Sequence, residues 1–122
     1  YMELDKLDDA ITYFGNVVRV RPKNINGWIE LLKCLYKAEM LEEALEYAGF
    51  AFEQTDGKPI FLFYKSAVLY AMGKSREALL NLEAGMNRNP KLVKKFIEIN
   101  PAILQIQQVV DVIARFKKRK SL

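Results

Sequence analysis

The sequence predicts an all-α fold, a solenoid of antiparallel helix pairs that ends in a C-terminal capping helix. Ala10, Ala44 and Ala78 recur 34 residues apart, each preceded by an acid and followed by an aliphatic residue. The apolar residues between them follow helical spacing, and only short turns separate the predicted helices. A fixed period of this size is typical of stacked repeats, in which one unit is copied because it cannot bury its apolar face alone.

The composition is that of one modest domain. Hydrophobic residues make up 51% of the 122 residues, which argues against disorder. No apolar run approaches the length of about 18 residues that a membrane span needs, and no cationic, apolar signal peptide is expected at the start. Cys34 is the sole cysteine, which excludes an intramolecular disulfide and is compatible with a reducing compartment such as the cytoplasm.

The predicted helices follow one another in a regular order. Residues 1–4 are interpreted as the last turn of a helix whose start is missing, and a first complete helix at 7–20 ends before Pro22, since proline cannot continue a helix. Further helices are expected at 25–39, 41–54, 59–72 and 75–87. Their short separators force neighbouring helices to run antiparallel. The predicted units are a half repeat at 1–24, full repeats at 25–58 and 59–90, and a C-terminal segment at 91–122.

The repeat pattern breaks down after Pro90. Residues 91–100 predict a short helix that Pro101 stops, and residues 102–118 predict a last helix. Its apolar side chains cover an arc of roughly 200°, wider than the stripe of about 100° that a surface helix needs. Two interpretations remain: the helix caps the last repeat and packs against 91–99, or part of its apolar face binds another domain or a second copy.

The third copy carries the clearest family signature. Its residues at the signature spacing are Leu62, Ser66, Leu69, Gly73, Glu77, Ala78, Leu82, Gly85 and Pro90. The second copy supplies Trp28, Leu31, Leu35, Ala44, Ala48 and Ala51, and the half unit supplies Tyr1, Ala10, Phe14, Val17 and Pro22. Over residues 1–90 the chain resembles the tetratricopeptide repeat family, with departures at Leu32, Glu39, Asp56 and Lys65. The resemblance implies a right-handed α-α superhelix and a role in protein–protein contacts.

In this family the first helix of each pair lines a concave groove, and the resemblance implies the same here. The residues that point away from the core stripe of these helices are Ile29, Lys33, Tyr36, Lys37, Ile60, Phe63, Tyr64, Ala67 and Tyr70. Aromatic side chains on a concave wall offer a large contact area at low rotamer cost, so a groove for a peptide or helix is predicted. The alternative is that upstream repeats or the C-terminal helix cover these rings.

One binding mode of the family, the capture of a C-terminal carboxylate by Lys, Asn and Arg, is not matched. Lys33 is cationic, but Phe63 and Ala67 stand where further polar residues would be needed. An apolar or aromatic ligand segment fits better, and Lys33 and Lys37 favour acidic residues at its flanks.

The net charge of +4 arises at the C-terminal end, where Lys117, Lys118, Arg119 and Lys120 carry four positive charges. The rest of the chain holds 15 basic and 15 acidic residues. A nucleic-acid-binding protein usually spreads basic residues over one face of the fold, so nucleic acid is a disfavoured partner. The tail is interpreted as a solvated end, with contact to an anion, a membrane surface or a nucleic acid as the alternative.

Residues suited to catalysis are scarce. The chain has no histidine, the commonest general base and metal ligand, and Cys34 lies on an apolar helix without a histidine to activate it. We therefore expect no enzyme activity, metal or cofactor. The leading hypothesis is a protein-interaction module. The second is a structural element that closes the C-terminal end of a longer solenoid, or that self-associates through an open N-terminal edge.

Overall fold

The computed structural model describes residues 2–121, with side chains described from residue 6 to residue 118. Within this range every regular element is a helix, which confirms the predicted all-α class. The elements are α1 (Met2–Val20), α2 (Ile25–Lys37), α3 (Leu41–Gln54), α4 (Ile60–Ala71), α5 (Ser75–Arg88), the 3-10 helix η1 (Pro90–Leu92), α6 (Val93–Ile99), the 3-10 helix η2 (Pro101–Gln105) and α7 (Gln107–Ser121). None of the described helices combines the length and the apolar character that a membrane crossing requires.

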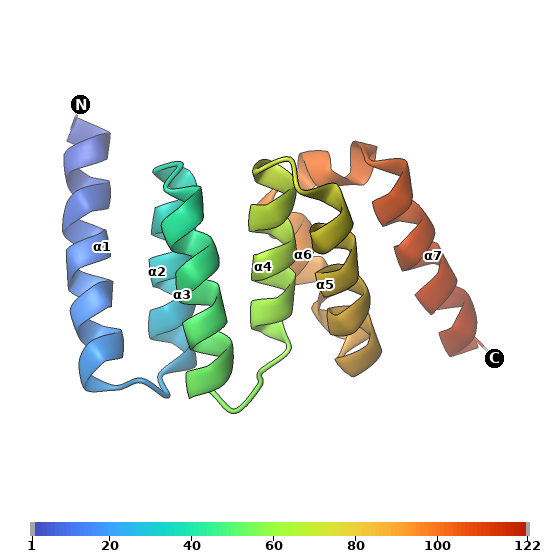
Figure 1. The fold of residues 1–122 in the computed structure, drawn as a ribbon, viewed down its shortest axis with the longest axis horizontal. Helices are drawn as coiled ribbons and strands as arrows, with labels where there is room; N and C mark the ends of the chain where they lie inside the picture. The colour runs from blue at the N-terminus through green and yellow to red at the C-terminus, as the bar shows by residue number, and fades with distance from the viewer. Residues whose placement is uncertain (1, 122) are drawn as a thin grey trace.

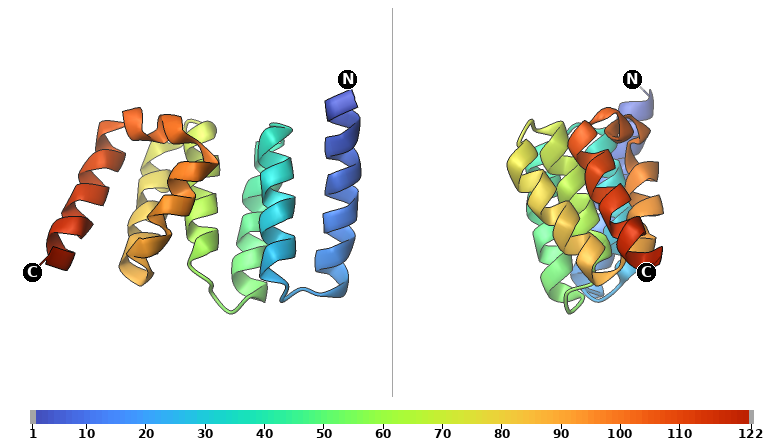
Figure 2. Two further views of the ribbon diagram at one scale, coloured as in Figure 1. Left: turned by 180° about the vertical axis from the view of Figure 1, so that it is seen from behind. Right: turned by 90° about the vertical axis from the view of Figure 1, so that its right-hand side faces the viewer.

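The helices stand side by side in an extended row that runs from α1 to α7 (Figure 1). Each of the first four helices packs on the next, while α6 packs on α4 and α7 packs on α5. The row has two sides: α3 and α5 lie on one, and α2 and α6 lie on the other (Figures 1 and 2). This separation decides which helices can contribute to one surface.

The turns after α2 and α4 have the same backbone geometry. Glu39 has φ 59° and Gly73 has φ 80°, and the two positions lie 34 residues apart. In the first turn the Met40 amide donates a 2.9 Å hydrogen bond to the Leu35 carbonyl oxygen, and the second turn closes in the same way. A helix end of this kind needs a residue in the left-handed conformation, which glycine adopts without steric cost. Glu39, which carries a Cβ atom in this conformation, is therefore strained.

We expect Glu39→Gly to raise the free energy of unfolding by up to about 1 kcal/mol. The cost of about 1–2 kcal/mol for a left-handed residue with a Cβ exceeds the cost of about 0.5–1 kcal/mol for ordering a glycine. Urea unfolding followed by circular dichroism measures the difference. The control is Glu39→Ala, which removes the same charge but keeps the Cβ atom. An equal gain for both variants would contradict the explanation by strain.

Small residues allow the helices to cross closely. Ala44, Ala48 and Ala51 of α3 and Ala78 of α5 are fully buried. Where α4 crosses α5, the buried Ser66 hydroxyl donates a 2.7 Å hydrogen bond to the Ala78 carbonyl oxygen, so this polar group is satisfied inside the core. The two later alanines of the 34-residue period therefore mark buried positions on equivalent helices.

The central helix α4 contributes to two apolar cores. Its Phe61 and Tyr64 belong to an N-terminal core with residues of α2 and α3. Its Phe63 and Ala67 belong to a C-terminal core with residues of α5, α6 and α7. Because α4 is buried on nearly every side, the elements on both of its flanks are held in place by packing on it.

At the N-terminal end the structure differs from the sequence prediction. α1 runs without interruption from Met2 to Val20, so residues 2–4 are not the last turn of a separate helix. Tyr1 lies outside the described residues. The physical reason is that Asp5 and Lys6, which separate the two predicted helices, include neither proline nor glycine, and adding residues to an existing helix is favourable.

The C-terminal region also differs in detail. The helix predicted at 102–118 is divided at Ile106, whose backbone is extended, into η2 and α7. Asn100 caps η2, since its side chain accepts a 3.1 Å hydrogen bond from the Ala102 amide. The break lets η2 bury Ile103 while α7 turns to pack on α5. Among residues 107–118 of α7, the buried side chains are Val109, Val112, Ile113 and Phe116.

Candidate functional site

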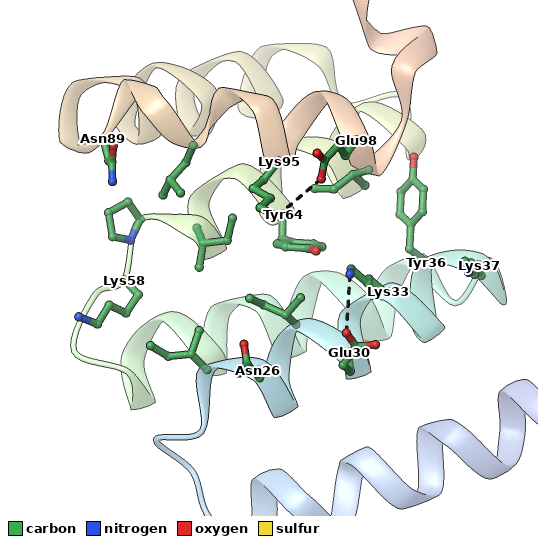
Figure 3. Close-up of a pocket in the computed structure, with 16 residues that line it drawn as sticks. Asn26, Glu30, Lys33, Tyr36, Lys37, Lys58, Tyr64, Asn89, Lys95 and Glu98 are labelled. Carbon is green, nitrogen blue, oxygen red and sulfur yellow. Dashed lines mark ion pairs between the residues drawn. The ribbon is translucent and has the colours of Figure 1, made fainter.

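A groove opens between α2 and α6, with α4 at its floor (Figure 3). Its volume is about 790 Å³, within the range of about 300–1,000 Å³ that ligand sites span. α2 forms one wall from Ile25 to Lys37, and α6 forms the other together with η1. At a rise of 1.5 Å per residue, the α2 wall is about 18 Å long.

The floor and lower walls of the groove are apolar and aromatic. These residues are Ile25, Ile29, Tyr36, Pro59, Ile60, Tyr64, Leu92 and Ile99. Several of them, including Ile29, Leu92 and Ile99, are partly buried against the N-terminal core, so packing holds them while part of each side chain stays accessible. A partner that covers them would gain about 25 cal/mol for each Å² of apolar surface removed from water.

The two tyrosines of the groove are held in different ways. The Tyr36 hydroxyl accepts a 3.2 Å hydrogen bond from Asn100 Nδ2, which joins α2 to the residue after α6. Tyr64 is only 4% exposed. Burial, with smaller contributions from Glu30 and Glu98, raises the pKa of its phenol to about 12. The folded protein therefore favours the neutral phenol at this position.

This pKa predicts how stability changes at alkaline pH. Folding raises the pKa of Tyr64 from 10.0 to about 12, so the unfolded chain loses this proton first and stability falls as the pH rises. The contribution of the phenol is fully present below about pH 10 and is lost progressively up to about pH 12. Tyr64→Phe should remove this part of the loss, measured by urea unfolding across that interval.

The control for this prediction is Tyr13→Phe, which makes the same chemical change at a side chain that is 63% exposed. It should retain the alkaline loss of stability seen in the wild type. If Tyr64→Phe and the wild type lost stability in parallel above about pH 10, the assignment to Tyr64 would be wrong.

Ion pairs line the middle of both walls. Glu30 Oε1 lies 3.6 Å from Lys33 Nζ on α2, and Glu98 Oε2 lies 3.8 Å from Lys95 Nζ on α6. All four side chains are about half exposed or more, so each pair stabilises the fold little. Each lysine in the middle of the groove therefore already has an acidic neighbour on its own helix.

Two further lysines lie at the ends of the groove. Figure 3 shows Lys58 at one end, just before α4, and Lys37 at the other, in the last turn of α2. Both are exposed, and neither forms an ion pair with a described side chain. The groove therefore has an apolar floor, ion pairs along the middle of its walls and a further positive charge at either end.

The structure brings together six of the predicted groove residues: Ile29, Lys33, Tyr36, Lys37, Ile60 and Tyr64. For Phe63 and Ala67 the prediction of an exposed wall position was wrong, because both are buried in the C-terminal core. The physical reason is that α6 packs on this face of α4, where the ring of Phe96 lies 5.9 Å from the ring of Phe63.

Tyr70, the remaining predicted residue, does not line the groove. Its ring packs half-buried against the C-terminal core. Its hydroxyl oxygen is buried and has no hydrogen-bond partner among the described residues, and burial followed by the charge of Glu83 raises the pKa of the phenol. Tyr70 is therefore a packing residue in this structure.

Sequence reasoning missed the second wall and one end of the groove. The missed residues include Lys58, Asn89, Leu92, Lys95, Glu98 and Ile99. Those of η1 and α6 follow Pro90, where the repeat period stops, so no register pointed to them. The spacing of Leu92, Lys95 and Ile99 at i, i+3 and i+7 places them on one helix face and is the signal that was available.

The basic end of the chain does not contribute to the groove. Lys117 and Lys118 are exposed on α7, and neither lines the groove. Lys117 borders a separate hollow of about 200 Å³ beside Met86 and Val93. The side chains of Arg119 and Lys120, which belong to the same predicted contact, lie outside the described residues.

The chemistry of the groove suits binding. Its accessible groups are aliphatic, aromatic, ammonium, amide and carboxylate groups. Among the described residues, no cluster of His, Cys, Asp and Glu could hold a metal ion. Burial raises the pKa of the Cys34 thiol, so this cysteine is protonated at neutral pH and a poor nucleophile.

No protein-family model matches the chain, and no curated protein is similar enough to be called a relative. The functional argument therefore rests on the geometry of the groove.

Proposed function

We propose that this chain is a protein-interaction module that binds a peptide or a helix in the groove between α2 and α6, without catalysis. The observation that carries the proposal is an apolar groove about 18 Å long with charged walls. Recognition sites of this kind derive affinity from the apolar floor, while the charges orient the partner. A helix of about three turns, or an extended segment of about five residues, matches this length.

We further infer that the helix pairs form a right-handed superhelix of tetratricopeptide type. This inference is supported by positions one period apart, which share their local structure. Glu39 and Gly73 both adopt the left-handed conformation, and Ala44 and Ala78 are both fully buried. A stack of such units presents an extended surface for binding along the helices of one side.

The aromatic contribution to binding comes from Tyr36 in this arrangement. Its ring lines the groove and is half-buried, whereas Phe63 and Ala67 are inaccessible. An accessible aromatic ring that a partner covers can contribute about 2 kcal/mol or more to binding. A test should therefore concentrate on Tyr36 and on Ile29, which lies about two turns before it on the same wall of the groove.

Peptide selection provides that test. A displayed library of random peptides, each of about 12 residues to cover three helical turns, is selected on the wild type. The binders are then titrated against Ile29→Ser/Tyr36→Ser by fluorescence anisotropy. Both side chains line the groove and are half-buried, so serine removes contact area without emptying a core. We expect affinity to fall by about 30-fold, which corresponds to about 2 kcal/mol.

The matched control is Leu80→Ser, which removes an apolar side chain that is 64% exposed on α5. It should bind the selected peptides as the wild type does. Circular dichroism must show that both variants remain helical. Peptides that bound the double variant as tightly as the wild type would place the binding surface outside the groove and remove the proposal.

A second candidate is an assembly role, in which the chain closes the end of a longer solenoid or self-associates through α1. Tyr13 and Val20 on α1 are 63% and 73% exposed, and the ring of Tyr13 packs edge-on against Phe14 at 5.1 Å. Exposed apolar side chains that gather on one face favour association. Sedimentation tests this role: Tyr13→Ser/Val20→Ser should lower any concentration-dependent mass of the wild type, and an unchanged mass would oppose it.

A further inference from the structure

The outer face of α3 carries an acidic surface that the proposed function does not use. Its glutamates are Glu42, Glu43, Glu46 and Glu53. All four are exposed, and none forms an ion pair with a described residue. α3 contains no lysine or arginine, so nothing on this helix offsets the negative charge.

Two aromatic rings lie within this acidic surface. Tyr47 is 38% exposed and Phe50 is 45% exposed, and their ring centroids lie 6.1 Å apart in an edge-on arrangement. Glu46 precedes Phe50 by four residues and Glu53 follows it by three, so all three side chains share one helix face. The outer face of α3 therefore presents an aromatic centre with carboxylates beside it and towards both helix ends.

The charge pattern of this face is the complement of the groove. The groove has Lys58 at one end, Lys37 at the other and an apolar floor between them, and its α2 wall is about 18 Å long. On α3, Glu43 and Glu53 lie about 15 Å apart along the helix axis, with the aromatic pair between them. The two surfaces correspond in the order of their charged and apolar groups, carry charges of opposite sign and have similar lengths.

We propose that the groove of one copy of this chain receives the outer face of α3 of a second copy. Tyr47 and Phe50 would cover the apolar floor, and the glutamates at the two ends of α3 would approach Lys37 and Lys58. This inference rests on the proposed function, because it names the helix that the groove binds. Lys33 and Lys95 already pair with neighbouring glutamates on the two walls, and they would remain at the rim of the contact.

The two surfaces lie on opposite sides of the molecule. Figures 1 and 2 show α3 on one side of the row of helices and α2 with α6 on the other. A contact between two different surfaces is head-to-tail, so each added copy leaves one groove and one α3 face unoccupied. The mass should therefore rise progressively with concentration. It should fall with salt, because exposed charges are screened within about 10 Å at 0.1 M ionic strength.

Two charge-reversed variants test the proposal. The groove variant is Lys37→Glu/Lys58→Glu, and the helix variant is Glu43→Lys/Glu53→Lys. Each variant alone has like charges on the two surfaces that should meet, so we expect it to remain monomeric. In an equimolar mixture each groove meets an α3 face of opposite charge. Sedimentation velocity at low salt should then show association only in the wild type and in the mixture.

The control is Glu77→Lys/Asp111→Lys, which reverses two exposed charges on α5 and α7 and should associate like the wild type. We expect the average mass of the wild type to at least double over the concentration range. A wild type that stays monomeric would overturn the proposal. So would a mixture that fails to associate although both variants are helical by circular dichroism.

The peptide selection separates this proposal from the proposed function. If selected peptides require Ile29 and Tyr36 while the wild type stays monomeric, the groove binds partners but a second copy is not among them. If the synthetic peptide of sequence 41–54 binds the groove and dissociates the assembled wild type, the second-copy contact is supported. Failure of both the peptide selection and the self-association would reject both proposals.

Discussion

Phe96→Ala is expected to lower the free energy of unfolding by about 3–5 kcal/mol. Phe96 is fully buried where α6 packs on α4, and its ring centroid lies 5.9 Å from that of Phe63. Removing the ring leaves a cavity between two helices and also removes a contact between aromatic rings, worth about 0.5–1.5 kcal/mol. Urea unfolding followed by circular dichroism measures the loss. Because α6 forms the second wall of the groove, the selected peptides should also bind this variant more weakly.

Leu104→Ala is the matched control, because it also truncates a large apolar side chain in the C-terminal region. Leu104 is 44% exposed on η2, so the change should stay within about 0.5 kcal/mol. A comparably small effect of Phe96→Ala would mean that the contact between α6 and α4 contributes little to stability. The second wall of the groove would then lack the support that the proposed function needs.

Gly85→Ala is expected to destabilise the protein by up to about 2 kcal/mol, although alanine is the better helix former. A Cβ atom at position 85 would lie 2.9 Å from Phe63 Cε2 and 3.0 Å from Phe63 Cζ. The ring of Phe63 is fully buried and has no room to move away. Overpacking of this kind costs about 1–3 kcal/mol, which outweighs the gain of about 1 kcal/mol in helix propensity.

Gly49→Ala makes the same substitution in α3, where no atom lies within 4 Å of the added Cβ position. This variant should be more stable than the wild type by about 0.5–1 kcal/mol. A second comparison uses Phe63→Leu, since a smaller side chain at position 63 should reduce the penalty of Gly85→Ala. Equal effects of the two glycine substitutions would show that the contact with Phe63 does not decide whether Gly85→Ala stabilises or destabilises the protein.

Local signals account for most of the helix boundaries. α2, α3, α4 and α5 begin and end within two residues of their predicted ranges. These boundaries depend on neighbouring residues: the helical spacing, the prolines Pro22 and Pro59, and the tight turn at Gly73. They can therefore be predicted from the sequence alone. The exceptions are α1, in which the predicted break is absent, and the division before α7, which was not predicted.

The candidate site was predictable in part for the same reason. Helical spacing defines which side chains share a face, so Ile29, Lys33, Tyr36 and Lys37 could be assigned to one wall before the structure was known. The same reasoning placed Phe63 and Ala67 on an equivalent wall. That step assumed that the equivalent face of α4 is uncovered, and nothing in the spacing of α4 itself tests this assumption.

By itself the sequence determined the all-α class, the 34-residue register and the face of α2 that stays outside the core. Each of these depends on spacing along the chain. Only the tertiary structure decided that α6 covers one face of α4, buries Phe63 and Ala67 against Phe96 and supplies the second wall of the groove. The physical reason is that burial of apolar surface is non-directional. The helix that covers α4 is therefore the one whose shape fills the space beside it, and the position of that helix along the chain does not identify it.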